Sequence, residues 1–513
     1  MSHTTSRKEL RRRRRIARIR SIIIICLVFF IAIAAILAVL HFTKGFELFP
    51  EKETEVAVET TTEEVTTAEE TTPVETTTEE TRENSMYSSD ELLAAAQKKA
   101  YMYDYDAAID MLTNAEGYAD NVDFVAAVSE FTKAKNSLVK WADNGKIPHI
   151  FFHTLIVDVT LAFDGDVDAA NYNQVMTTVE EFKRILQQMY DNGYVLISIY
   201  DIASMQVDGE GNEVMVQNAI YLPEGKKPFI MSQDDVSYYE YMTGDGYASK
   251  LVIGEDGKVT NEYINPDGTI SYGSYDMIPI LDDFIEEHPD FSYHGAKGII
   301  ALTGYEGVLG YRTSEYSYGA NSTENKDFLY VNPNIEADRE AAKAVADALK
   351  ADGWLFACHG WGHRIMGKER SYELFKADID MWYSEVIPII GDCDILIYPR
   401  GDDIGSWRQY TDTTEGHQYA ETLIKYNHCK ELGFDYYCNV DSSQYWVQVT
   451  KEYVRTGRRN IDGTRLFEAL CGYRDLLSDL IDPVTVWDDY RPQPVEGVPV
   501  PEGYVIPDTG GRQ

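Results

Sequence analysis

Short apolar runs alternate with longer amphipathic segments between about residues 147 and 466 of the 513-residue chain. Residues 179–192 place apolar side chains three and four positions apart, which predicts a helix with one buried face. Gly193 would end this helix, and the apolar residues 194–199 would form the next buried strand. The same order of helix, glycine and strand recurs at 280–302, 340–357 and 422–435. This repetition predicts parallel α/β layers.

The first 87 residues have a different pattern. Residues 22–40 are an apolar run without a charge, long enough to span a bilayer, and five consecutive arginines (11–15) precede it. Under the positive-inside rule we expect a cytoplasmic basic tail (1–20), a single-pass anchor in the cell membrane (21–42) and an extracytoplasmic remainder. A cleaved signal peptide is the competing interpretation. The Thr- and Glu-rich residues 43–87 have little to bury and are expected to be a disordered linker.

Three further segments complete the predicted organisation. Residues 88–145 contain strong helix formers and a stretch (100–109) that resembles the turn of one tetratricopeptide helix pair, so we expect a helical, TPR-like spacer. The main α/β domain would occupy residues 146–470, and residues 471–513 would be a C-terminal tail. Within the domain, residues 251–260 read as an inserted β-hairpin.

Composition narrows the choice of partners. The formal net charge is -39, with a pI near 4.5. Nucleic-acid binding requires a basic surface, so no nucleic-acid partner is expected. The chain has six cysteines and no C-x-x-C pair, which argues against a zinc ribbon or a thioredoxin-type redox motif.

Two polar clusters follow predicted strands. Asp234 and Asp235 come directly after an apolar run, and His359 and His363 come after another. The carboxyl ends of parallel strands meet at one rim of a sheet or barrel, where ligands bind. Two imidazoles four positions apart and a carboxylate from another strand can hold one divalent metal with a position left open for water. The second carboxylate would be free to act as a general base.

These motifs, in this order, resemble the NodB-type polysaccharide deacetylases of carbohydrate esterase family four. The resemblance covers about residues 147–466 and implies a distorted (β/α) barrel with fewer than eight strands. It implies Asp234 as the general base and Asp235, His359 and His363 as ligands of a divalent metal. Zinc is the favoured metal, with cobalt, nickel, manganese and iron as alternatives. A strand that closes with Pro399 also fits, and Arg400, which stands in the family's aromatic position, would stabilise the oxyanion through its backbone N–H.

The implied function is the removal of acetyl groups from an N- or O-acetylated envelope polysaccharide, such as peptidoglycan or a chitin-like glycan. Two departures from the family bear on activity. No histidine follows His428, although the family uses a late histidine to protonate the leaving amine. The arginine that orients the base is also unassigned among four candidates: Arg400, Arg455, Arg458 and Arg459.

Alternatives remain at this point. One is a catalytically inactive relative that binds glycan in the same groove, and another is a barrel glycosidase with paired carboxylates. Trp361 and the tyrosines of residues 238–241 would suit stacking on sugar rings, although both could be core residues. His153 and His294 are expected to be structural.

Overall fold

The computed structural model describes residues 88–319, 331–367, 370–412, 418–441 and 443–505. The predicted basic tail, membrane anchor and linker lie outside these residues. Among the helices that are described, none is both long enough and apolar enough to cross a membrane.

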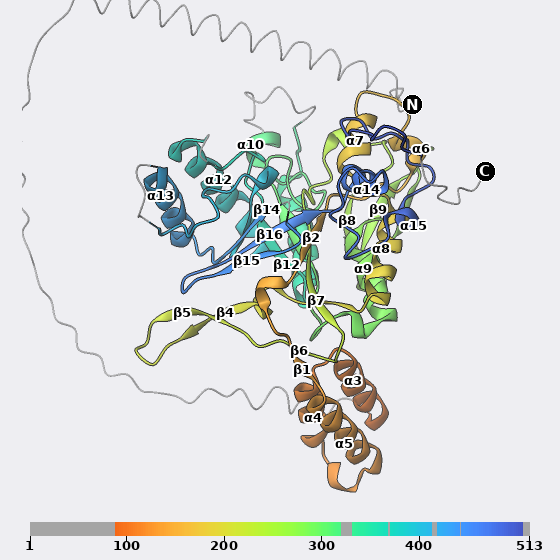
Figure 1. Cartoon of the computed structure of the whole chain (residues 1–513), viewed down its shortest axis with the longest axis vertical. Coiled ribbons are helices and arrows are strands. Elements are labelled where there is room, and N and C mark those ends of the chain that lie inside the picture. Colours follow the sequence, from red (N-terminus) through yellow and green to blue (C-terminus); the bar gives the residue numbers. More distant parts are fainter. Residues whose placement is uncertain (1–87, 320–330, 368–369, 413–417, 442, 506–513) are drawn as a thin grey trace, which may run out of the picture. The chain divides into compact units, whose positions relative to one another are not determined.

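Seven parallel strands close into a barrel (Figure 1). Their order around the ring is β11, β12, β13, β14, β16, β2 and β7, and pairing of β7 with β11 closes it. The strands are β2 (His149–Phe152), β7 (Lys227–Gln233), β11 (Ile299–Leu302), β12 (Leu355–Cys358), β13 (Ile395–Ile397), β14 (Tyr436–Val440) and β16 (Val454–Asn460). Outside the ring, β3 (Tyr194–Leu196) pairs with β7, and β15 (Trp446–Val449) runs antiparallel to β16. The predicted α/β barrel class is therefore confirmed.

Helices surround the strands, and the first of them, α8 (Val179–Asp191), shows how the sequence specifies them. Thr178 and Glu181 form a capping box that satisfies backbone donors at its start. Its buried side chains recur at the predicted spacing, and Gly193 follows with φ 78°. The other long helices of the barrel are α9 (Met277–Glu287), α11 (Ile335–Ala351), α12 (Tyr372–Ile390), α13 (Gln418–Glu431) and α14 (Gly463–Leu470).

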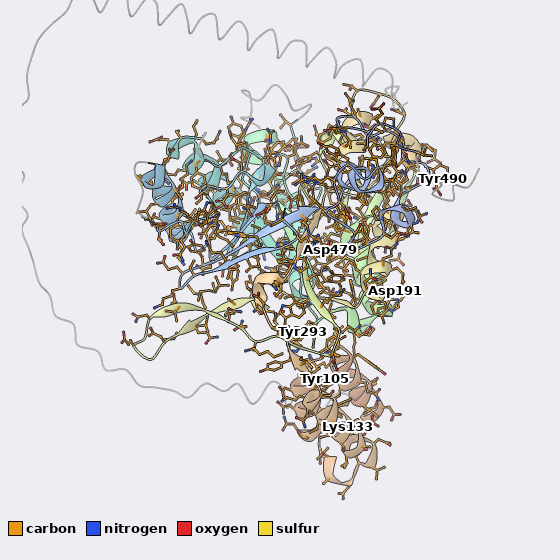
Figure 2. All side chains as sticks on the ribbon, in the orientation of Figure 1. Tyr105, Lys133, Asp191, Tyr293, Asp479 and Tyr490 are labelled. Atoms are coloured by element: carbon orange, nitrogen blue, oxygen red, sulfur yellow. The ribbon has the colours of Figure 1, made fainter. Side chains whose placement is uncertain are left out.

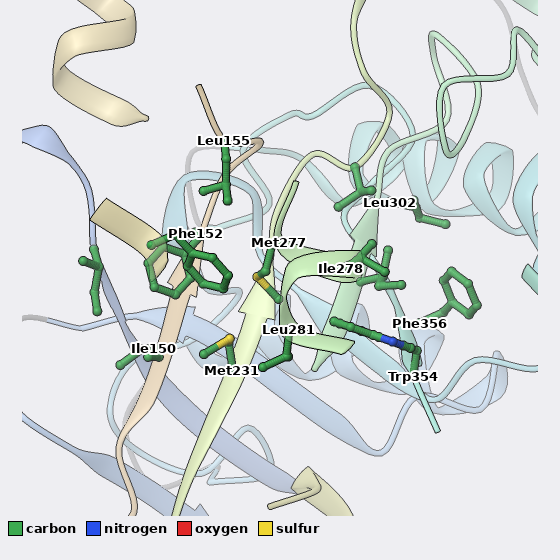
Figure 3. Close-up of a cluster of buried hydrophobic side chains, with 14 of the residues drawn as sticks. Ile150, Phe152, Leu155, Met231, Met277, Ile278, Leu281, Leu302, Trp354 and Phe356 are labelled. Carbon is green, nitrogen blue, oxygen red and sulfur yellow. The ribbon is translucent and has the colours of Figure 1, made fainter. Parts of the chain in front are cut away.

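The strands separate two apolar cores, because successive side chains point to opposite faces. Side chains on the outer face, among them Phe152 and Met231, pack against helices such as α9, as Figure 3 shows. Side chains on the inner face, among them Ile230, Ile299 and Ile397, form a separate cluster inside the barrel. Strands buried on both faces explain why the sequence reads as continuous apolar runs.

The segment before the barrel is helical, as predicted. It consists of α3 (Ser89–Tyr101), α4 (Tyr105–Thr113) and α5 (Val122–Asn136), which enclose a small core that includes Leu92, Leu112 and Phe124. Tyr103 donates a hydrogen bond to the carbonyl of Asp290 (2.8 Å) and so connects this unit to the main domain.

In the described residues, three small antiparallel sheets lie outside the barrel. The insertion forms a sheet of β8 (Lys250–Ile253), β9 (Val259–Ile264) and β10 (Ile270–Gly273), so the predicted hairpin is present with one additional strand. The other two pair β1 (Val139–Lys140) with β6 (Tyr221–Leu222), and β4 (Ala203–Val207) with β5 (Glu213–Gln217). Short helices are α6 (Val159–Ala162), α7 (Ala169–Val175), α10 (Glu315–Tyr318) and α15 (Pro483–Val486).

The described residues after 470 pack on the domain; Figure 2 labels Asp479 and Tyr490 in this segment. Arg459 of β16 forms a bidentate ion pair with Asp479 (2.7 and 3.0 Å). Arg491 reaches back to the carboxylate of Glu181 at the start of α8, and both side chains are fully buried. A buried pair of this kind is costly to break, so this segment is bound tightly to the barrel.

Candidate metal centre

The predicted ligands come together at the carboxyl ends of the barrel strands. Asp235 follows β7, and His359 and His363 follow β12. One ligand atom from each of the three lies within 4.8 Å of the others, and Nε2 of His363 is 3.7 Å from Oδ2 of Asp235. Two imidazole nitrogens and one carboxylate oxygen are a donor set for a divalent transition metal. The arrangement is compatible with such an ion and does not identify it.

Two of the three ligands are oriented by hydrogen bonds to neighbouring groups. Nδ1 of His359 lies 2.8 Å from the carbonyl of Ile397, which fixes the tautomer that leaves Nε2 for the metal. The hydroxyl of Tyr239 donates to Oδ1 of Asp235 (2.6 Å) and contacts Oγ1 of Thr303 (2.8 Å). Partners of this kind orient a ligand side chain and fix which of its atoms is available to a metal.

Two ligands also occupy unusual backbone conformations. Asp235 has φ 61° and His363 has φ 50°, in the left-handed region that non-glycine residues rarely adopt. Such a conformation costs about 1–3 kcal/mol and persists only where surrounding contacts enforce it. The buried carboxylate of Asp378 supplies one such contact, because it accepts the backbone N–H of Gly362 (3.1 Å). The loop between the two histidines is therefore tied to helix α12.

Asp234, the predicted base, forms a bidentate ion pair with Arg458 of β16 (2.6 and 2.9 Å). Burial, the largest single influence, raises the pKa of Asp234, but the charge and hydrogen bonds of Arg458 together with the nearby His359 and His153 hold that pKa well below its usual range. Asp234 is therefore ionised and oriented. The geometry selects Arg458 from the four candidates, because Arg455 pairs with Asp403, Arg459 pairs with Asp479 and the Arg400 side chain is exposed.

His153, which was expected to be structural, lies at the same rim as the two aspartates. It follows β2, the neighbour of β7, and lies close enough to Asp234 and Asp235 for its charge to lower the pKa of both. Its Nδ1 lies 3.0 Å from the carbonyl of Val175, so Nε2 is left for other contacts. The signal that could have identified it is position, because His153 ends a strand as the aspartates and the histidine pair do.

Arg400, the predicted oxyanion donor, lies beside the histidine loop. Pro399 approaches Gly360 so closely that a Cβ at Gly360 would lie 3.6 Å from the proline ring. Arg400 itself has φ 60°, in the left-handed region that non-glycine residues rarely adopt. Its assignment as an oxyanion donor stays a prediction.

Of the two roles open to the aromatic residues near the site, Tyr238 and Tyr239 have the core role. Tyr238 and Tyr239 are buried, and the hydroxyl of Tyr238 donates to the buried carboxylate of Asp276 (2.7 Å). Trp361 is half-buried, and its indole N–H donates to Glu385 (2.9 Å). These rings support the loops that carry the ligands, so Tyr238 and Tyr239 are unavailable for stacking on a sugar.

A second group of candidate metal ligands was not singled out in the sequence. Asp166, Asp168 and Asp245 place one carboxylate oxygen each within 4.8 Å of the others. An all-carboxylate set suits a hard cation such as Ca²⁺ or Mg²⁺, although acidic residues often cluster without binding any ion.

Comparison with known proteins adds one finding. No family model and no curated protein matches the chain. Among solved structures, the Streptococcus pyogenes deacetylase PplD in complex with acetate is similar, with a TM-score of 0.30 and 12% identity over 64% of this chain and 95% of that one. A likeness at this level establishes neither a family nor an activity for the chain.

Proposed function

We propose that this protein is a metal-dependent hydrolase that removes acetyl groups from an N- or O-acetylated polysaccharide of the cell envelope. The observation that carries the proposal is the juxtaposition at one barrel rim of a three-ligand group and a separate ionised carboxylate. A metal site alone suits many functions. A metal site beside a buried, ionised carboxylate suits hydrolysis, because the carboxylate can accept a proton from water activated by the metal.

Each residue of the rim has a defined task in such a reaction. Asp235, His359 and His363 would hold the ion, which when bound polarises the acetyl carbonyl and lowers the pKa of water towards about 7. Asp234 accepts the proton of the attacking water, and Arg458 keeps that carboxylate ionised and oriented. The backbone N–H of Arg400 donates a hydrogen bond to the oxygen on which negative charge develops.

His153 supplies the proton for the leaving group in this proposal. The acid in this step is the His153 imidazolium, in which Nδ1–H donates to the Val175 carbonyl and Nε2–H is the proton transferred to the leaving amine, so that the neutral Nδ1–H imidazole remains. This residue replaces the late histidine that the sequence lacks.

We expect His153→Gln to lower kcat for an N-acetylated glycan by about a hundredfold, which is within the usual contribution of general acid catalysis. The same variant should hydrolyse p-nitrophenyl acetate at nearly the wild-type rate, because p-nitrophenolate leaves without a proton. His294→Gln, which alters a histidine stacked on Tyr293 (3.9 Å between ring centroids) in a different part of the chain, is the matched control. An equal loss on both substrates would assign His153 a structural role.

One assay decides between the candidate functions. Purified protein is incubated with N-acetylated chito-oligosaccharide and with peptidoglycan, and both acetate and glycan fragments are measured. Acetate release without chain cleavage supports the proposal. Chain cleavage would favour a glycosidase, and binding of glycan without either product would favour an inactive relative.

The substrate and location rest on the sequence. We propose that the N-terminal apolar run anchors the protein in the membrane and that the linker carries the barrel to the glycan outside. A reporter fused after residue 87 should then be active only outside the cytoplasm. Reporter activity in the cytoplasm, or a mature N-terminus beyond Leu40, would contradict this topology.

A further inference from the structure

The interior of the barrel changes from apolar to polar towards the carboxyl ends of the strands. Ile230 and Val454 belong to the apolar cluster inside the barrel. Ser232 and Thr456 lie two positions further along the same strands, so strand alternation also directs them inward. Both are buried, as are His149 and Arg458. Strands β16, β2 and β7 are neighbours, and these four polar side chains form a layer directly beneath Asp234.

The four side chains are connected by hydrogen bonds. Besides its ion pair with Asp234, Nη1 of Arg458 donates to Oγ of Ser232 (3.1 Å). Oγ of Ser232 lies 3.0 Å from Nε2 of His149. Nδ1 of His149 lies 2.9 Å from Oγ1 of Thr456.

The direction of these hydrogen bonds follows from the protons available. Burial, together with the nearby Arg458 charge, holds the pKa of His149 well below its usual value, so its ring is neutral. A neutral imidazole has one donor and one acceptor. We assign the tautomer in which Nδ1–H of His149 donates to Thr456 and Nε2 accepts the proton of Ser232, which itself accepts from Arg458. Every bond then points away from the guanidinium.

Besides Asp234 and Ser232, the Arg458 side chain contacts Asn439 and Phe151. Its Nε–H donates to the carbonyl of Asn439 (3.3 Å), and the guanidinium carbon lies 4.1 Å from the centroid of the Phe151 ring. We infer that Ser232, His149 and Thr456 are positioning residues, which hold Arg458 and through it aim the carboxylate of Asp234 at the attacking water. This inference rests on the proposed function, because it assigns the layer to the same reaction.

The test compares variants of the full chain by kcat, KM and metal content. Ser232→Ala should lower kcat for acetate release about tenfold, the usual effect of losing one hydrogen bond to a charged group, with KM and bound metal unchanged. Thr456→Val should also lower kcat, and Thr456→Ser, which restores the hydroxyl, should recover it. Ser292→Ala is the matched control, since Ser292 is equally buried and donates to the carbonyl of Ala296 (2.7 Å) away from the rim.

A double-mutant cycle distinguishes positioning from a general loss of structure. If Ser232 acts through Arg458, adding Ser232→Ala to Arg458→Met should change kcat less than twofold. Two results would overturn this inference and leave the proposed function intact. One is that the kcat losses of Ser232→Ala and Arg458→Met add in the double variant; the other is that Ser232→Ala is as active as an active wild-type protein. A wild-type protein that releases no acetate would instead overturn the proposed function.

Discussion

Asp234→Asn is expected to reduce acetate release by roughly 10²–10⁴-fold while the metal stays bound. The amide keeps the size of the side chain and removes the proton acceptor. The ligands Asp235, His359 and His363 are untouched, so metal content should equal that of the wild type. Acetate release and bound metal are measured on the same preparation, which separates the base from the ligand beside it.

Removing the charge of Asp234 also leaves Arg458 buried without its partner, and breaking a buried ion pair costs about 3–5 kcal/mol of stability. Asp479→Asn is therefore the control, because it breaks the bidentate pair with Arg459, the next residue along β16. We expect the control to lose stability and keep its activity. Full activity of Asp234→Asn would show that the base is another group, with Asp402 and Asp403 as the next candidates.

Loss of a ligand should abolish both metal binding and activity. His359→Ala and His363→Ala each remove one of three donors, whereas changes to groups that merely support a ligand typically cost about 10–100-fold in metal affinity. We therefore expect metal content to fall well below one ion per chain after dialysis, with acetate release lost in parallel. Tyr239→Phe, which removes only the hydroxyl that contacts Asp235, should weaken binding by about 10–100-fold.

Metal affinity should also depend on pH, and measuring this dependence is a second test of the histidine ligands. Protons compete with the metal for imidazole nitrogen, so affinity must fall as the pH decreases. Burial lowers the pKa of His359 below its ordinary value, so protons compete for this imidazole only at a pH below the ordinary histidine range. Unchanged metal content in both His359→Ala and His363→Ala would contradict the proposed metal site.

The strand-end motifs of the site could be predicted because they depend on local sequence. A buried strand shows as an apolar run, and the polar residue after it must lie at the rim; this rule located Asp235, His359 and His363. Val236 follows the aspartate pair, and the turn here is made by Asp235, which adopts the left-handed conformation.

The Arg458–Asp234 pair and the position of His153 depend on which strands are neighbours in the barrel. The order of the strands along the chain does not determine their neighbours. Arg458 reaches Asp234 only because β16 and β7 flank β2 in the closed ring. His153 lies near the aspartates for a related reason. Tyrosines are ambiguous in sequence because the same ring can stack on a sugar or fill a core, and the buried Tyr238 and Tyr239 took the second role.

The most direct test of the central claim is a metal titration of the stripped protein. Chelated and dialysed protein receives Zn²⁺ stepwise, and acetate release from N-acetylated chito-oligosaccharide is measured against bound metal. The proposal predicts no acetate release at the start, a rise with the first bound ion, and no rise in His359→Ala at any Zn²⁺ concentration. Full activity in the stripped protein, or no acetate release once an ion is bound by Asp235, His359 and His363, would contradict it.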